Sequence, residues 1–220
     1  MFESAELGHS ITKQTYARQV PKLREALLDA QYDLFQDGRF PVIVLIGGVD
    51  SSGKGETVNL LNEWMDPRHI RTVAFAEPSE EERERPPMWR YWQALPPKGK
   101  IGILFGHWYT KPIFDRVSRA TKHPQLIESL DEIARLERMF TDEGALVLKF
   151  WFHLSKAAQK KNLKRWRETR RRDGRPATWN GSTSSATTGC GRFPNLPCAK
   201  PAARHAPGSW SRRSIRIIAI

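Results

Sequence analysis

The stretch from Val42 to Thr57 limits most strongly what this chain can fold into, because it joins an apolar run to a glycine-rich turn. The run Val42–Ile46 is mostly β-branched and has no polar alternation, which predicts a strand buried on both faces. Gly48, Gly53 and Lys54 follow at the spacing G-x-x-x-x-G-K of a phosphate-binding loop. The residues after Lys54 have helical periodicity. Strand, glycine-rich turn and helix are the context that such a loop requires.

The residue types in this loop fit the chemistry of phosphate binding. Small residues let successive backbone N–H groups converge on phosphate oxygens, and the following helix directs its positive end at the same anion. We expect the phosphates to be bound by Gly48, Ser51, Ser52, Gly53, Lys54 and Gly55. Gly55 stands where a Ser or Thr usually ligates magnesium, so we expect Asp50 to hold or orient Mg²⁺ instead. A chance match within a glycine-rich turn is the less favoured interpretation.

Strands and helices alternate along residues 1–164, which predicts an α/β domain with a parallel sheet flanked by helices. Strands are expected near 42–46, 70–76, 100–105 and 145–154. Helices are expected near 13–36, from the loop to about 65, at 115–122, from Pro124 onward, and after Ser155 as a basic helix. We expect the helix at 13–36 to pack its apolar face on the sheet.

Positive charge is concentrated at the end of the chain. The net charge is +12, but residues 1–164 hold 24 Lys and Arg against 22 Asp and Glu, whereas residues 165–220 hold 12 against 2. Hydrophobic periodicity stops after Lys164 and returns only at Ile215–Ile218, so we predict a disordered or poorly packed basic tail over residues 165–220. We favour out-of-frame translation of a GC-rich gene as its origin over a natural tail. A basic RNA-binding tail is the less favoured alternative.

Several classes of protein are not indicated by the sequence. Both cysteines, Cys190 and Cys198, lie in the tail without a histidine pattern, so neither a disulfide framework nor a zinc site is expected. No apolar run approaches the roughly 20 residues of a membrane span, and the N-terminus does not read as a signal peptide. We therefore expect a cytoplasmic protein that binds neither membrane nor nucleic acid.

Two further segments have alternative interpretations. The aromatic cluster Trp89–Trp92 is favoured as core, and the alternative is stacking on a base with Arg90 meeting a phosphate. The charged residues 77–85 before it are interpreted as a solvated helix start. Lys156 and the lysines that follow form either a solvated face or a lid over phosphate chains, and the sequence favours neither.

Together these residues resemble the polyphosphate kinase 2 family, and most closely the N-terminal half of two-domain polyphosphate:AMP phosphotransferases. The resemblance covers residues 10–164 and rests on the blocks Gly48–Gly55, Trp89–Pro96, His107–Lys111, Asp115–Val117 and Lys149–Lys156. It implies a phosphate-loop kinase fold related to thymidylate kinase. It also implies phosphoryl transfer between inorganic polyphosphate and a nucleotide such as AMP or ADP, with Mg²⁺, and assembly into a homo-oligomer.

The same resemblance implies roles for individual residues. Lys54 would hold the transferring phosphates, Asp50 would orient metal or acceptor, and Arg116 would contact phosphate. Lys156 would begin the lid. Arg90 and Trp108 are expected near the nucleotide or acceptor.

One departure from the family pattern bears on activity. Active members carry an Asp-Arg pair at the end of the third strand, and this chain has Phe105 and Gly106 there. The likeness also stops being recognisable after Lys164. We therefore expect binding with slow transfer, improved by Phe105→Asp with Gly106→Arg if the site is otherwise assembled. A non-catalytic phosphate-binding module that supports a catalytic half, and an ATP-dependent small-molecule kinase, remain alternatives.

Overall fold

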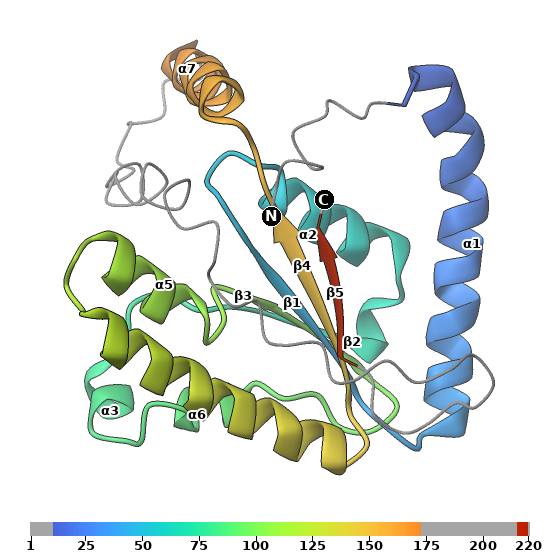
Figure 1. Ribbon diagram of the computed structural model, residues 1–220. Coiled ribbons are helices and arrows are strands. Elements are labelled where there is room, and N and C mark those ends of the chain that lie inside the picture. Colours follow the sequence, from blue (N-terminus) through green and yellow to red (C-terminus); the bar gives the residue numbers. More distant parts are fainter. Residues whose placement is uncertain (1–10, 173–214, 220) are drawn as a thin grey trace, which may run out of the picture.

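The computed structural model describes residues 11–172 and 215–219, and Figure 1 shows their arrangement. The helices are α1 (Lys13–Asp37), α2 (Lys54–Trp64), α3 (Glu80–Arg83), α4 (Trp89–Gln93), α5 (Thr110–Val117), α6 (His123–Asp142) and α7 (Lys156–Arg172), with a 3₁₀ turn, η2, at Pro67–His69. The strands are β1 (Val42–Gly48), β2 (Ile70–Ala74), β3 (Ile101–Phe105), β4 (Leu146–Phe152) and β5 (Ile215–Ala219).

All neighbouring strands pair in parallel, in the order β2-β3-β1-β4-β5. The α/β fold with a parallel sheet is therefore confirmed, and each of the four expected strands is present. β1 lies between β3 and β4, with Ile46 opposite Phe105 on one side and Phe150 on the other. The loop after β1 thus leaves the carboxyl end of the sheet between two neighbouring strands. This is where open α/β sheets bind ligands.

β1 contributes to two hydrophobic cores because successive side chains point to opposite faces. Ile43 and Leu45 belong to the core that contains Ile133 of α6. Val44 and Ile46 belong to the other core, with Val58 of α2. Helices α1 and α2 accordingly lie on one side of the sheet and α5 and α6 on the other (Figure 1). Burial on both faces explains the uninterrupted apolar run, and each such side chain contributes about 1.5–3 kcal/mol.

Helix α1 forms where its periodicity predicts but packs less broadly than expected. Thr12 caps its start, and Gly38, in the left-handed region at φ 60°, donates its N–H to the carbonyl of Leu34 at its end. Only Gln31 and Leu34 are buried among its 25 residues. The side chain of Gln31 makes two hydrogen bonds to the backbone of Asp66, of 2.9 and 2.8 Å. The helix is therefore attached mainly through its last turns.

The helix expected at 115–122 is wrong in its bounds, because α5 begins at Thr110 and ends at Val117. The carbonyl of Asp115 accepts from the N–H groups of Ala120 and Thr121, which closes the helix. Arg119 follows the helix end in the left-handed region at φ 62°. The next helix, α6, has Pro124 in its first turn as predicted. Ser155 also caps α7 as predicted, accepting a hydrogen bond from the N–H of Ala158 at 3.3 Å.

Two segments of the predicted tail have regular secondary structure, which we did not expect. Helix α7 continues to Arg172, and Ile215–Ala219 forms β5, with Val147 opposite Ile215 and Trp151 opposite Ala219. A short apolar run cannot form a core alone, but it can join an existing sheet by hydrogen bonding to the free edge of β4. Residues 173–214 and 220 lie outside the described residues.

Across the part of the chain that the structure describes, no helix combines the length and apolar character needed to cross a bilayer.

Candidate phosphate-binding site

The turn from β1 into the loop requires glycine because β4 lies directly against it. Gly48 has a φ of 133°, and a Cβ there would lie 2.1 Å from the carbonyl oxygen of Phe152. A Cβ on Gly47 would lie 2.8 Å from Nε2 of His107. The next residue, Val49, donates its backbone N–H to the same Phe152 carbonyl at 2.9 Å. Close contact with β4 therefore fixes where the loop begins.

Lys54 is the first residue of α2, as the loop spacing predicts. Its ammonium donates to the carbonyl of Gly48 at 2.7 Å and lies 3.9 Å from Oδ1 of Asp50. Burial lowers the pKa of Lys54, and the Asp50 carboxylate opposes that shift. The ammonium also lies 5.7 Å from the centre of the Phe105 ring. The Lys54 side chain thus connects the first turn of α2 to the start of the loop.

The loop carbonyls are hydrogen-bonded to donors of the protein itself. Gly48 accepts from Lys54, Val49 from the Ser52 hydroxyl, Asp50 from Gln159, Ser51 from Asn162, and Gly53 from Thr57. The backbone N–H groups of Asp50, Ser51, Ser52 and Gly53, by contrast, have no protein acceptor among the described residues. An arc of free donors at a helix N-terminus is an anion-binding arrangement.

Asp50 provides a carboxylate within the same loop. Its Oδ2 atom is buried and has no hydrogen-bond partner among the described residues, while Oδ1 faces Lys54. No group of three or more His, Cys, Asp or Glu side chains suited to a metal occurs in the described part of the chain. Mg²⁺ is usually held by a carboxylate or two together with substrate phosphates and water. Asp50 therefore fits as a single protein ligand for a phosphate-bound Mg²⁺.

A buried polar cluster lies behind the loop. Nζ of Lys149 on β4 is 2.5 Å from Oε2 of Glu137 and 2.9 Å from the hydroxyl of Tyr109. The indole N–H of Trp108 donates to Oε1 of Glu137 at 3.1 Å. Burial, then Lys149 and Lys54, lower the pKa of His107 from 6.5 to about 3, so this imidazole is neutral. The cluster joins the segment after β3 to β4 and α6.

Comparison with known proteins identifies the family. A model of the family "Polyphosphate kinase 2 (PPK2)" matches residues 10–175. The chain belongs to the polyphosphate kinase 2 family. The match extends past Lys164, where we expected the likeness to end.

Among related proteins, a polyphosphate:AMP phosphotransferase of Pseudomonas aeruginosa is 58% identical over 164 residues, which are 74% of this chain and 33% of the relative. Another, from Pseudomonas syringae pv. tomato, is 52% identical with the same coverage. The chain thus spans about a third of the length of these relatives.

Two crystal structures share the fold. That of a candidate polyphosphate kinase 2 from Pseudomonas aeruginosa PA01 has a TM-score of 0.74 at 51% identity, covering 87% of this chain and 39% of that one. That of Polyphosphate Kinase 2 from Arthrobacter aurescens TC1 also has a TM-score of 0.74, at 22% identity, covering 83% and 65%. The second similarity supports the fold alone.

Not every residue expected at the site of this polyphosphate kinase 2 domain lies at the loop. Trp108 is 1% exposed and donates to Glu137, so its side chain lies in the core and not at the loop, and its contact with a nucleotide stays a prediction. The large ring packs in the core, and its indole N–H is hydrogen-bonded there. Arg116 donates to the Thr121 carbonyl at 3.4 Å, within its own segment. Lys156 is exposed at the first turn of α7.

Arg90 has partners within the protein. It donates to the carbonyl of Ala76 at 2.9 Å, its Nε lies 3.4 Å from Oε1 of Glu82, and its guanidinium lies 5.1 Å from the centre of the Phe75 ring. Glu82 also forms a capping box with Ser79 at the start of α3. Glu82, which belongs to the charged segment 77–85, therefore makes contacts within the protein and is not simply a solvated charge. These contacts fix the segment that follows β2.

Sequence reasoning missed Gln159 and Asn162, although both contact the loop. They lie three residues apart on α7 and so share one of its faces. Their polar amides stand among many lysines, and only the lysines were singled out. The available signal was an amide pair at helical spacing after a strand that borders β1.

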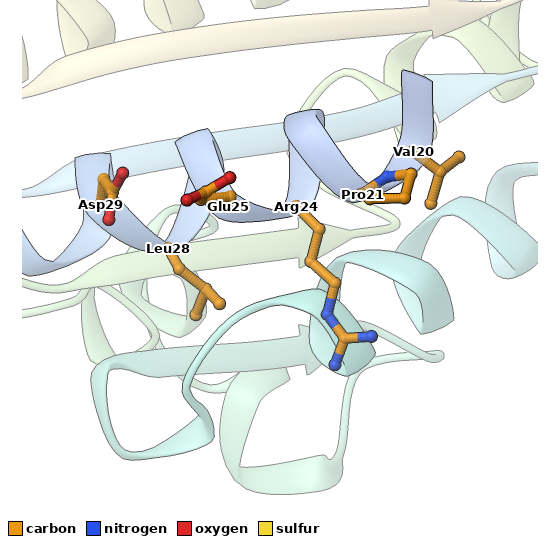
Figure 2. A pocket seen from close by; sticks show the side chains of 6 residues that line it. All are labelled: Val20, Pro21, Arg24, Glu25, Leu28 and Asp29. Atoms are coloured by element: carbon orange, nitrogen blue, oxygen red, sulfur yellow. The ribbon is translucent and has the colours of Figure 1, made fainter. Parts of the chain in front are cut away.

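A hollow of about 410 Å³ lies on α1 and is lined by Val20, Pro21, Arg24, Glu25, Leu28 and Asp29, none of which belongs to the loop. Figure 2 shows these six side chains, all from α1. The hollow carries one cation and two carboxylates, so it does not suit a polyanion.

Proposed function

We propose that this chain binds inorganic polyphosphate at the loop after β1 and carries out phosphoryl transfer between polyphosphate and a nucleotide. The observation that supports this best is the loop itself, in which the carbonyls are hydrogen-bonded to the protein and four successive N–H groups are not. AMP is the first acceptor to test, because the relatives of 58% and 52% identity are named polyphosphate:AMP phosphotransferases. We further propose assembly into a homo-oligomer, on the family likeness, and the cytoplasmic location that we expected from the sequence.

Different groups of the loop would bind different parts of the ligand. The free N–H groups of residues 50–53 would bind phosphate oxygens at the positive end of α2. The Lys54 ammonium would exchange its bond to the Gly48 carbonyl for a phosphate oxygen, which is a stronger, charge-assisted acceptor. Asp50 would hold Mg²⁺, which when bound neutralises charge on the phosphates.

Phe105 leads us to expect slow transfer by this chain. It ends β3, beside the Lys54 ammonium, and its ring cannot ligate a metal. Phosphoryl transfer depends on charge neutralisation and alignment, so a missing carboxylate costs rate more than affinity. This observation also favours the second candidate function, a phosphate-binding module that supports a catalytic half elsewhere.

The substitution expected to restore activity needs correction. Gly106 has a φ of 77°, and a Cβ there would lie 2.8 Å from the carbonyl oxygen of Phe75. Gly106→Arg would therefore strain the backbone, whatever it contributed to the site. Phe105→Asp alone adds the carboxylate without that strain and is the better test.

The test is a coupled assay of ADP formation from AMP, polyphosphate and Mg²⁺ with the full chain, together with calorimetry of polyphosphate binding. We expect binding with slow turnover, and faster turnover in Phe105→Asp. Binding without any turnover in either protein would favour the supporting module. Turnover with ATP but not with polyphosphate as donor would show an ATP-dependent kinase, and no binding of polyphosphate would refute the proposal.

A further inference from the structure

We propose that Gln159 and Asn162 of α7 are positioning residues that hold the phosphate loop in its anion-binding shape. The docking of α7 would then set the affinity of the loop for phosphate chains. This inference rests on the proposed function, since it assigns a role at the same site.

The contacts join segments far apart in sequence. Nε2 of Gln159 donates to the carbonyl of Asp50 at 3.3 Å, and Nδ2 of Asn162 donates to the carbonyl of Ser51 at 3.1 Å. Gln159 is only 7% exposed, whereas the neighbouring Lys160 and Lys161 are exposed. The amide face of α7 is thus turned to the loop and its basic face to solvent.

Peptide geometry links these two bonds to anion binding. In a trans peptide the carbonyl and the next N–H point in opposite directions. The Asp50 carbonyl shares its peptide with the N–H of Ser51, and the Ser51 carbonyl shares its peptide with the N–H of Ser52. Each amide of α7 that binds a carbonyl on one side therefore directs an N–H to the other side. These are two of the N–H groups that have no protein acceptor among the described residues.

The backbone at Ser51 requires such support. Its φ is 60°, in the left-handed region that residues with a side chain seldom occupy. Such a conformation persists where surrounding contacts over-determine it. The carbonyl that Asn162 binds belongs to this same residue. Without the α7 amides, the two peptides can rotate and present carbonyl oxygens to the phosphates, which repels them.

The coupling must act in both directions. If docked α7 raises the affinity of the loop for phosphate, bound phosphate raises the stability of docked α7 by the same factor. Amide exchange in the first turns of α7 should therefore slow when phosphate chains bind, although α7 is not assumed to touch them.

The test uses the full chain with Gln159→Met and Asn162→Leu, alone and together. These substitutions keep most of the side-chain volume and remove the donor. Calorimetry with tripolyphosphate measures affinity, ¹⁵N relaxation measures the order of the Ser51 and Ser52 amides without ligand, and thermal unfolding measures stability. Gln36→Met makes the same chemical change at an exposed position of α1 and is the matched control.

We expect each single variant to bind tripolyphosphate roughly five-fold more weakly, the effect of losing one ordinary hydrogen bond, with a fall in Tm of no more than about 4 °C. The order parameters of the two loop amides should fall, and Gln36→Met should match the original chain. Unchanged loop order in the double variant would overturn the inference, as would affinity losses that merely follow losses in Tm. If the original chain does not bind tripolyphosphate, the proposed function fails, and the loop order in the ligand-free variants still decides this inference.

Discussion

Replacing Lys149 by Met should destabilise the protein strongly, because it leaves a buried carboxylate without its cation. Lys149 is 9% exposed and Glu137 is 1% exposed, and their charged atoms lie 2.5 Å apart. In Lys149→Met, the indole N–H of Trp108 is the one hydrogen-bond donor that remains to the Glu137 carboxylate among the described residues. Breaking a buried pair in this way costs about 3–5 kcal/mol, a large share of the roughly 5–15 kcal/mol that holds a domain folded.

A second substitution separates the charge from the packing. Glu137→Gln in the Lys149→Met background removes the unpaired charge and keeps an acceptor for Trp108. The double variant should therefore recover most of the lost stability, with a coupling of about 2 kcal/mol or more. The free energy of unfolding is measured by urea titration, with equal slopes required for comparison. Lys98→Met, at an exposed loop position, is the control.

The reasoning is refuted if Lys149→Met loses less than about 1 kcal/mol, which is the typical cost of a point substitution of any kind. It is also refuted if the two substitutions simply add. Either result would mean that the Lys149 ammonium does not stabilise the Glu137 carboxylate.

Three further outcomes follow from the site. Lys54→Ala should weaken polyphosphate binding by about 1.5–3 kcal/mol in calorimetry while circular dichroism shows an intact fold, and unchanged affinity would contradict a phosphate role. Gly48→Ala should destabilise the fold by more than about 2 kcal/mol in urea titration, because the added Cβ meets the Phe152 backbone. The pKa of His107 is lowered from 6.5 to about 3, so only the unfolded chain binds its proton between those values. The free energy of unfolding should therefore fall as pH falls below about 6.5, by up to ~1.4 kcal/mol per pH unit. In His107→Gln the urea midpoint should change less with pH than it does in the original chain.

Local patterns in the sequence were sufficient to predict much of the fold. The run Val42–Ile46 could be predicted as a doubly buried strand because β-branched residues without polar alternation suit little else. The loop spacing likewise predicted Lys54 at the start of α2. Both depend on residues close together in sequence.

The features that could not be predicted depend on contacts between distant segments. Trp108 was expected near the nucleotide on the family resemblance, but Glu137, 29 residues later, supplies a buried acceptor for its indole. Gln159 was overlooked because its partner, the Asp50 carbonyl, is 109 residues away. The pairing of β5 with β4 was not predicted, because we asked only whether the short run Ile215–Ile218 could form a core alone. We did not ask whether it could join the edge of an existing sheet.

That pairing has a consequence for shortened versions of this protein. β5 covers the outer edge of β4, whose sequence Leu-Val-Leu-Lys-Phe-Trp-Phe has one polar residue in seven. Cutting the chain after α7 would leave that edge with a row of unpaired N–H and C=O groups on an apolar strand. Such an edge is a template on which a second molecule can add a strand, so the shortened protein should aggregate more readily, as light scattering would show.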